Sequence, residues 1–217
     1  MKLTKEEAVK KLFIYAKIYQ DKRLNKMFLI IYKDRINLKL NYIEVLFLKR
    51  NFQHLTGIDL IDKNGNILHG QSHNFFRKCI QKKLTPKEIA FKQDGTTQLK
   101  FEALPTLMNI NKVTKIVGDY NNLRPYLCVD KVVGGVNFCL GLKQNRDDDL
   151  YFPASALNFD IRDLSIYSSQ VIAIFSKENI ESIYETVQYT AKGVNLNNIN
   201  FPLDIKNVIK LTNYTYK

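Results

Sequence analysis

Apolar residues at spacings of three and four predict that the chain begins with an amphipathic helix. Thr4 and Glu7 have the S/T-x-x-E spacing of a capping box, which marks a helix start. An apolar stripe follows directly, at Val9, Leu12, Phe13, Ala16 and Tyr19. Lysines occupy the other face. We therefore expect this helix to pack on the rest of the protein through its apolar side.

Runs of branched and aromatic residues predict strands after this helix. Residues 26–33 (KMFLIIYK) and 42–48 (YIEVLFL) flank a polar stretch, so an antiparallel pair is expected. Gly57 is placed to close a short helical turn at the end of residues 51–58. Asn64-Gly65 predicts a tight turn. Further helical segments are expected over residues 73–84, from Thr85 onward, and within residues 97–108.

Strand patterns dominate the second half of the chain. The expected strands are residues 115–120, 126–133, 136–143 and 170–175. Gly134-Gly135 is expected to form the two-residue turn of a hairpin. Residues 179–190 suit a helix, and residues 195–200 (NLNNIN) suit a polar linker to a short tail.

This segregation of helices and strands indicates an α+β fold rather than an alternating α/β fold. The chain has 217 residues, no internal repeat and no long linker. A length of roughly 100–200 residues per domain is usual. We therefore expect one domain over residues 1–217, with a core at about residues 3–190 and a C-terminal extension at residues 191–217.

Positive charge is the strongest signal in the composition. Lys and Arg number 33 against 21 Asp and Glu, which gives a net charge of +12 and a pI of about 9.5. Such a balance is typical of proteins that bind nucleic acid, and RNA is the expected partner. The same charge also suits membrane surfaces and acidic proteins, or reflects AT-rich coding alone.

The remaining composition favours a bacterial cytoplasm as the location. Residues 1–11 are already charged and helix-like, so no signal peptide is expected, and no apolar run approaches the ~18 residues of a membrane span. No membrane partner is expected. Cys79, Cys128 and Cys139 are an odd, scattered set, which speaks against a disulfide framework and for a reducing compartment.

Several catalytic classes are excluded by missing motifs. The chain has no G-x-x-x-x-G-K-[ST] loop, no G-x-G-x-x-G, no H-E-x-x-H and no G-x-S-x-G. His69 and His73 are too few for a zinc site, and the acidic run at residues 147–149 is better explained as a charged turn. Neither a metal nor another cofactor is expected.

One segment gathers reactive groups directly after a predicted strand. Residues 49–57 (KRNFQHLTG) combine cations, an amide, an imidazole and a hydroxyl. His54 has an ordinary pKa near 6.5, so it can accept or donate a proton at neutral pH. RNA cleavage by the ribose 2′-hydroxyl needs such a group, together with cations that stabilise the phosphate charge, and needs no metal. The alternative is that His54 caps a helix or lies in the core.

The same segment carries a resemblance to a known family. A hydrophobic strand running into NFQHLTGI (51–58) resembles the phage-associated lineages of the barnase–EndoU–colicin–RelE-like nuclease superfamily, in particular the fourth lineage. YFPASAL (151–157), followed by the strand QVIAIFSK (170–177), is similar to the C-terminal half of that family. The resemblance implies N-terminal helices packed on an antiparallel β-sheet. It also implies metal-independent ribonuclease activity, as a toxin or mobile-element effector.

The resemblance also assigns roles to residues. It implies that His54 is the general acid or base with Thr56 beside it, and that Ser155 contacts a phosphate or ribose. It does not fix Lys143 and Lys177, which we select because both follow strands and could hold the phosphate. Each lysine could equally be an ordinary solvated strand end.

Two functional hypotheses follow. The first is a small endoribonuclease that cleaves RNA through its 2′-hydroxyl. The alternative is a non-catalytic mobile-element protein that binds RNA, a nucleoprotein or an acidic host protein. An antitoxin is a further possible partner under the first hypothesis, and a host protein under the second. RNA cleavage by the purified protein separates the two hypotheses.

Overall fold

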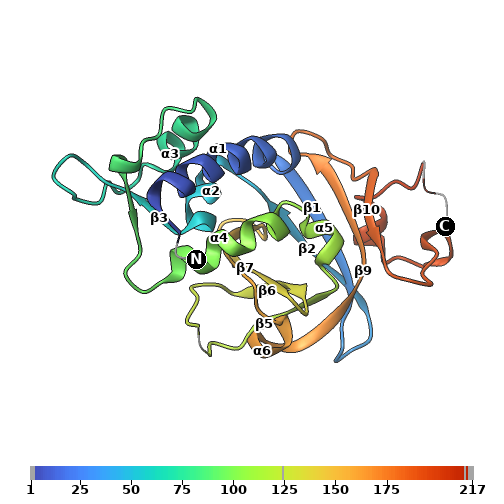
Figure 1. The fold of residues 1–217 in the computed structure, drawn as a ribbon. Helices are drawn as coiled ribbons and strands as arrows, with labels where there is room; N and C mark the ends of the chain where they lie inside the picture. The colour runs from blue at the N-terminus through green and yellow to red at the C-terminus, as the bar shows by residue number, and fades with distance from the viewer. Residues whose placement is uncertain (1–2, 124, 213, 215–217) are drawn as a thin grey trace.

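The computed structural model describes residues 3–123, 125–212 and 214, and its centre is a closed β-barrel (Figure 1). Seven strands pair in the order β1-β2-β8-β7-β6-β5-β9, and pairing of β9 with β1 closes the ring. An eighth strand, β10 (Thr186–Thr190), extends from β9. The barrel strands are β1 (Lys26–Lys33), β2 (Leu40–Leu46), β5 (Ile116–Tyr120), β6 (Lys131–Gly135), β7 (Phe138–Gln144), β8 (Tyr151–Leu157) and β9 (Ser165–Glu178).

The expected α+β arrangement of helices on an antiparallel sheet is therefore wrong. The cause is the length of β9, whose 14 residues far exceed the strand predicted at residues 170–175. Its first part pairs with β5, and its second part pairs with β1 and β10. The ring also contains one parallel contact, between Val45 of β2 and Tyr151 of β8. The strand predictions in the two halves of the chain thus belong to one barrel.

Strand β1 is buried on both faces, which explains its unbroken apolar sequence. Phe28 and Ile30 belong to the core shared with the helices. The alternate residues Met27, Leu29 and Ile31 face a second core, which the C-terminal segment covers. That segment contributes the turn η2 (Leu196–Asn198) and the helix α7 (Leu203–Lys206). Its buried side chains are Leu196, Phe201 and Ile205. The stretch expected as a polar linker therefore anchors part of this core.

The principal helices lie around one side of the barrel (Figure 1). The capping box of Thr4 and Glu7 starts α1, as predicted. Tyr19 of α1 is fully buried, and its ring contacts Phe52 at 5.2 Å between ring centroids. Its hydroxyl donates to the Leu48 carbonyl at 2.9 Å. These helices are α1 (Lys5–Lys22), α2 (Lys49–Thr56), α3 (Ser72–Ile80), α4 (Thr96–Leu107) and α5 (Ile110–Val113). The short helix α6 (Ile161–Leu164) lies elsewhere and contacts β6 and β9.

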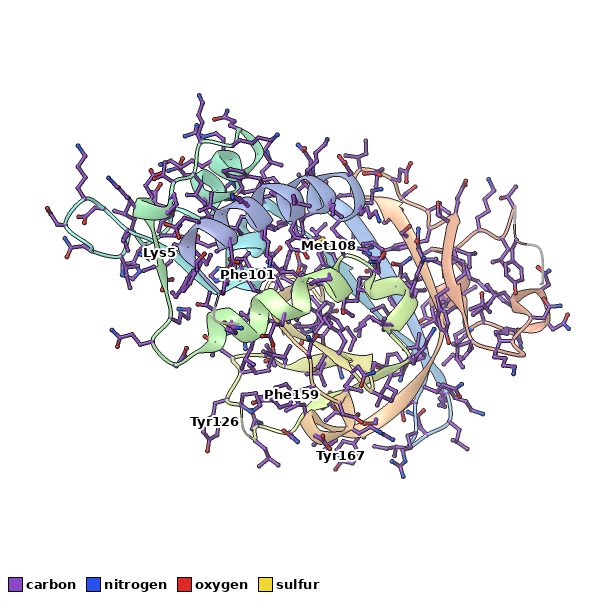
Figure 2. All side chains as sticks on the ribbon, viewed as in Figure 1. Lys5, Phe101, Met108, Tyr126, Phe159 and Tyr167 are labelled. Carbon is purple, nitrogen blue, oxygen red and sulfur yellow. The ribbon has the colours of Figure 1, made fainter. Side chains whose placement is uncertain are left out.

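A small two-stranded sheet lies among α2, α3 and α4. Strand β3 (Ile58–Leu60) pairs with β4 (Ile89–Phe91) in a separate two-stranded sheet. The helix expected from Thr85 onward is only a three-residue turn, η1 (Pro86–Glu88), which precedes β4. Buried and exposed aromatic side chains are visible in Figure 2: Phe101 of α4 is buried, whereas Tyr126 and Tyr167 are exposed.

The glycine pair in the second half does not form a turn. Gly134 and Gly135 are the last residues of β6, and the turn is made by residues 136–137. A Cβ atom on Gly134 would lie 2.0 Å from the Phe138 carbonyl oxygen, and one on Gly135 would lie 2.8 Å from the Val113 oxygen. Glycine is required at both positions because other backbone segments approach so closely that a side chain would not fit.

The helix expected over residues 179–190 is also wrong. The segment forms turns and then β10, where branched residues suit a strand. Tyr184 is fully buried, and its hydroxyl donates to Glu44 Oε1 at 2.6 Å. Cys79 and Cys139 are buried, whereas Cys128 is exposed. Within the described residues, every helix is too short or too polar to cross a membrane.

Candidate functional site

Helix α2 is short, its two ends are capped, and it places His54 at the surface. The Asn51 side chain accepts a hydrogen bond from the Leu48 backbone N–H at 2.8 Å at the start of the helix. Gly57 ends the helix in the left-handed conformation with φ 67°, as its position predicted. Phe52 and Leu55 are fully buried and fix the orientation of the helix. His54 is therefore held on the exposed face, and it is not a core histidine.

A cavity of about 150 Å³ opens beside His54. It lies between the end of α2, strand β3, the loop after β3 and the start of α4. Its charged and titratable members are His54, Asp59, His69, Lys92 and Lys100. The other lining residues are Gln53, Gly57, Ile58, Ile67, Leu68 and Gly70. We call this cavity the His54 pocket.

Lys100 is attached to the end of α2 by direct contacts. Its Nζ donates to the His54 carbonyl oxygen at 2.8 Å. A Cβ atom on Gly57 would lie only 3.0 Å from Lys100 Cδ, so the lysine stem passes over a glycine. Thr97 donates to the Gly57 carbonyl at 2.7 Å and accepts from the Lys92 backbone N–H at 2.9 Å. These bonds tie His54, Lys92 and Lys100 into one unit.

The electrostatics of the pocket push its two central groups toward complementary protonation states. Partial burial lowers the pKa of His54 below its usual 6.5, and the positive charges of Lys100 and Lys92 lower it further. Burial, followed by the charge of Lys92, lowers the pKa of Lys100 to about 8. Lys92 pairs with Asp59 at 3.3 Å. Near pH 7, His54 is thus a free base and Lys100 is mostly a protonated acid.

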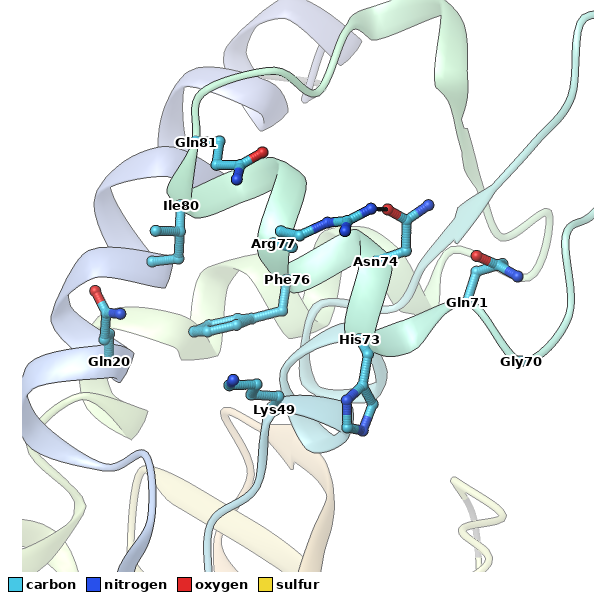
Figure 3. Close-up of a pocket in the computed structure, with 10 residues that line it drawn as sticks. All are labelled: Gln20, Lys49, Gly70, Gln71, His73, Asn74, Phe76, Arg77, Ile80 and Gln81. Atoms are coloured by element: carbon cyan, nitrogen blue, oxygen red, sulfur yellow. Dashed lines mark hydrogen bonds between the residues drawn. The ribbon is translucent and has the colours of Figure 1, made fainter.

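A larger cavity of about 520 Å³ lies between α1, α2 and α3 (Figure 3). Lys49 comes from α2, and His73 and Arg77 come from α3. Arg77 donates to the Asn74 side chain at 2.9 Å. No carboxylate is among its lining residues in the described chain, which are Gln20, Lys49, Gly70, Gln71, His73, Asn74, Phe76, Arg77, Ile80 and Gln81. We call it the Lys49 pocket. Gly70 lines both pockets.

The His54 pocket thus combines a base, an acid and one further cation, Lys92, which are groups that phosphoryl transfer can use. The family model for the phage-Barnase-EndoU-ColicinE5/D-RelE like nuclease4 matches residues 11–193. The chain belongs to this nuclease family. The predicted resemblance to the fourth phage lineage is confirmed. No curated protein and no solved structure matches the chain.

Every residue of both pockets lies within the part of the chain that matches this phage nuclease family. Of the predicted site residues, the structure places His54 in a pocket with other titratable groups. Thr56 follows on the same helix, but its hydroxyl is fully buried. It donates to the Gln53 carbonyl at 2.8 Å and accepts from the Ile58 N–H at 3.3 Å. Thr56 thus helps to end α2.

Ser155, Lys143 and Lys177 do not line the His54 pocket. Ser155 is buried on β8 opposite Gly141, and its hydroxyl has no hydrogen-bond partner among the described residues. Lys143 Nζ donates to Asp130 Oδ1 at 2.8 Å. Lys177 Nζ donates to the Ser182 carbonyl at 3.2 Å and lies 4.5 Å from the centre of the Tyr184 ring. Their assigned contacts with a phosphate or ribose stay predictions.

Sequence reasoning missed Lys92 and Lys100. A lysine on a helix or after a strand usually faces solvent, and nothing in the local pattern distinguishes these two. The histidines, by contrast, all line the two pockets: His54 and His69 line one, and His73 lines the other. No group of three or more His, Cys, Asp or Glu side chains within the described residues is arranged to hold a metal ion.

Proposed function

We propose that this phage-family nuclease cleaves RNA in the His54 pocket through attack by the ribose 2′-hydroxyl, without a metal ion. The observation that supports the proposal is the pairing of His54 and Lys100 in one exposed cavity. Their pKa values are shifted so that one can take a proton and the other can give one at neutral pH. Lys92, which pairs with Asp59 at 3.3 Å, is a further cation in the same cavity.

The reaction balances with these groups alone. Neutral His54 takes the proton of the 2′-hydroxyl, and the 2′-oxygen attacks the adjacent phosphorus. The bond from phosphorus to the 5′-oxygen breaks, and Lys100 gives that oxygen its proton. The products are a 2′,3′-cyclic phosphate and a 5′-hydroxyl. Lys92 stabilises the negative charge that develops on the phosphate oxygens.

The Lys49 pocket supplies a path for the rest of the strand. Its two cations can pair with backbone phosphates, and its amide side chains can donate to and accept from base edges. The absence of carboxylates in its described lining avoids repulsion of the RNA. A strand that crosses the loop at Gly70 would therefore meet cationic groups on both sides.

An RNA substrate with one 2′-deoxy position tests the mechanism. A fluorescent oligoribonucleotide is incubated with the protein in EDTA, its cleavage position is mapped, and a second substrate carries 2′-deoxyribose there. We expect cleavage of the first with a 2′,3′-cyclic phosphate end, and no cleavage at the modified position in the second. Equal cleavage of both contradicts 2′-hydroxyl attack. Binding without any cleavage favours the non-catalytic RNA binder.

A role as a toxin or mobile-element effector is part of the same proposal. Growth arrest on expression of the wild-type protein, relieved by His54→Ala, is the expected outcome. Arrest that is unchanged by His54→Ala, with both proteins produced at equal levels, contradicts an effector role based on cleavage.

A further inference from the structure

Arg23, the residue that ends α1, is a buried cation. Only 3% of its surface is exposed. Its Nη2 donates to the Met108 carbonyl at 2.9 Å and to the Asn111 side chain at 3.0 Å. Its guanidinium lies over the Phe28 ring, 5.2 Å from the ring centre. Its Nε atom is buried and has no hydrogen-bond partner among the described residues.

No carboxylate of the described residues forms an ion pair with Arg23. A buried charge is normally paired, because transfer of an unpaired ion out of water is very unfavourable. Burial lowers the pKa of Arg23 to about 10, despite an opposing effect of Tyr19. The group still carries its charge near pH 7. The described residues therefore hold a positive charge in the interior without supplying a carboxylate that pairs with it.

A cavity of about 280 Å³ opens against Arg23. Lys22, Lys26 and Lys112 add three more cations to its lining. Lys26 lies 3.5 Å from Glu178, outside the lining. The lining carboxylate, Asp21, pairs with Lys17 at 2.8 Å. The remaining members are Phe28, Met108, Asn109, Asn111 and Gln188.

A hydrogen-bonded series of amides fixes the orientation of the polar wall. Asn111 accepts from Arg23, and its Nδ2 donates to Gln188 Oε1 at 2.9 Å. Gln188 Nε2 then donates to the Ser176 hydroxyl at 2.8 Å. The wall is thus held by bonds that link the end of α1 to α5, β10 and β9. Such fixed orientation is typical of a site rather than of loose surface side chains.

We propose that this cavity, the Arg23 pocket, binds a phosphate group. Lys26 pairs with Glu178, but Lys22, Arg23 and Lys112 have no carboxylate partner among the described residues, and the one lining carboxylate is already paired; this balance favours a ligand with two negative charges. Guanidinium and ammonium groups match the several oxygens of phosphate, whereas a carboxylate ligand offers two oxygens and one charge. The bound anion supplies the counter-charge that Arg23 lacks.

The Arg23 pocket is separate from the proposed cleavage site. Lys100 lies near the start of α4, and Met108 follows its end. Eight residues of helix correspond to about 12 Å. The two pockets share no lining residue. Phosphate binding here therefore does not depend on the proposed RNA cleavage, and either proposal can fail alone.

Thermal unfolding with inorganic phosphate tests the proposal. Phosphate is titrated against sodium chloride of equal ionic strength, since a ligand that binds only the folded state raises Tm in a saturable way. The decisive variant is Asn111→Asp, which places a carboxylate beside Arg23. We expect it to raise Tm without phosphate and to weaken phosphate binding at least tenfold. Lys39→Ala, an exposed lysine outside the pocket, is the matched charge control and should bind as the wild type does.

Two further measurements keep the test decisive. The Arg23 Nε–H signal in an NMR spectrum of the ¹⁵N-labelled wild-type protein should shift as phosphate is added. Adenosine monophosphate is the second probe: tighter binding than inorganic phosphate assigns the group to a nucleotide, and equal binding assigns it to free phosphate. The proposal is overturned if phosphate acts no differently from chloride. It is also overturned if a folded Asn111→Asp variant binds phosphate as the wild type does, or if the Arg23 signal is unmoved at saturation.

Discussion

Gly57→Ala is expected to displace Lys100 in the His54 pocket, and this effect on cleavage can be measured separately from the effect on stability. Gly57 has φ 67°, a left-handed conformation that costs a residue with a Cβ atom about 1–2 kcal/mol. The added Cβ would also lie 3.0 Å from Lys100 Cδ and 3.3 Å from Thr97 Cα. Ordinary contact begins near 3.4 Å, so Lys100 has to shift by several tenths of an ångström. The Lys100 stem is the softer of the two neighbours and is expected to give way.

The glycine at position 193 provides a matched control. Gly193 has φ 79°, and a Cβ atom there would have no neighbour within 4 Å. Gly193→Ala should therefore carry the same backbone cost and leave the pocket alone. Both variants should lower Tm by a few degrees, because about 1 kcal/mol corresponds to about 2–4 °C in a chain of this size. Only Gly57→Ala should also lower cleavage.

The assay is RNA cleavage under single-turnover conditions in EDTA, at a temperature where each variant is folded. We expect about a tenfold loss of rate for Gly57→Ala, since small displacements of catalytic groups have large effects on rate. Gly193→Ala should cleave as the wild type does. In a Lys100→Ala background, Gly57→Ala should have little further effect on the rate. Equal rates for the two glycine variants, or full additivity with Lys100→Ala, would refute the placement of Lys100 in the reaction.

Three further outcomes are expected. The cleavage rate should rise with pH as His54 loses its proton below pH 6.5 and fall as Lys100 loses its proton near pH 8; Lys100→Met should remove the upper limb of this profile. Gly134→Ala should lower the free energy of unfolding, measured with urea, by about 3 kcal/mol or more, because its Cβ would lie 2.0 Å from the Phe138 carbonyl oxygen. Gly65→Ala is the comparison, since a Cβ there would have no neighbour within 4 Å, and an equal loss in the two variants would contradict the contact at Gly134. Lys49→Ala and Arg77→Ala should each weaken RNA binding and reduce the slope of log K against log salt by about 0.7; an unchanged slope would exclude the Lys49 pocket from the RNA path.

The sequence predicted those helices and strands whose ends are determined by neighbouring residues. The capping box at Thr4 set the start of α1, and the apolar run at residues 26–33 matched β1 at both ends. Gly57 marked the end of α2 because a left-handed residue is needed there. In each case the determining contacts lie within a few residues along the chain, where spacing and residue type carry the information.

The barrel could not be predicted because its closure depends on distant pairing. Residues 26–33 of β1 pair with residues 170–178 of β9, and a strand pattern gives the buried face but not the partner. Gly134 shows the related difficulty with single residues. A glycine pair between two strand patterns favours a turn, whereas here Phe138 and Val113 approach both glycines.

The candidate site was predictable only in part for the same reason. His54 was found because unusual residue types cluster around it in sequence. Lys92 and Lys100 gave no local signal, since the bond from Lys100 to the His54 carbonyl joins residues 46 positions apart. Arg23 is similar, because its hydrogen-bond acceptors, Met108 and Asn111, are far away in the sequence.

The most direct test of the central claim is the cleavage rate of His54→Ala in EDTA. The surface control is Lys10→Met, at an exposed lysine on α1 that lines neither proposed RNA pocket. We predict RNA cleavage by the wild type and the control, a loss of at least about 100-fold for His54→Ala, and partial recovery when imidazole is added. Cleavage by folded His54→Ala at the wild-type rate would contradict the assignment of the reaction to this pocket.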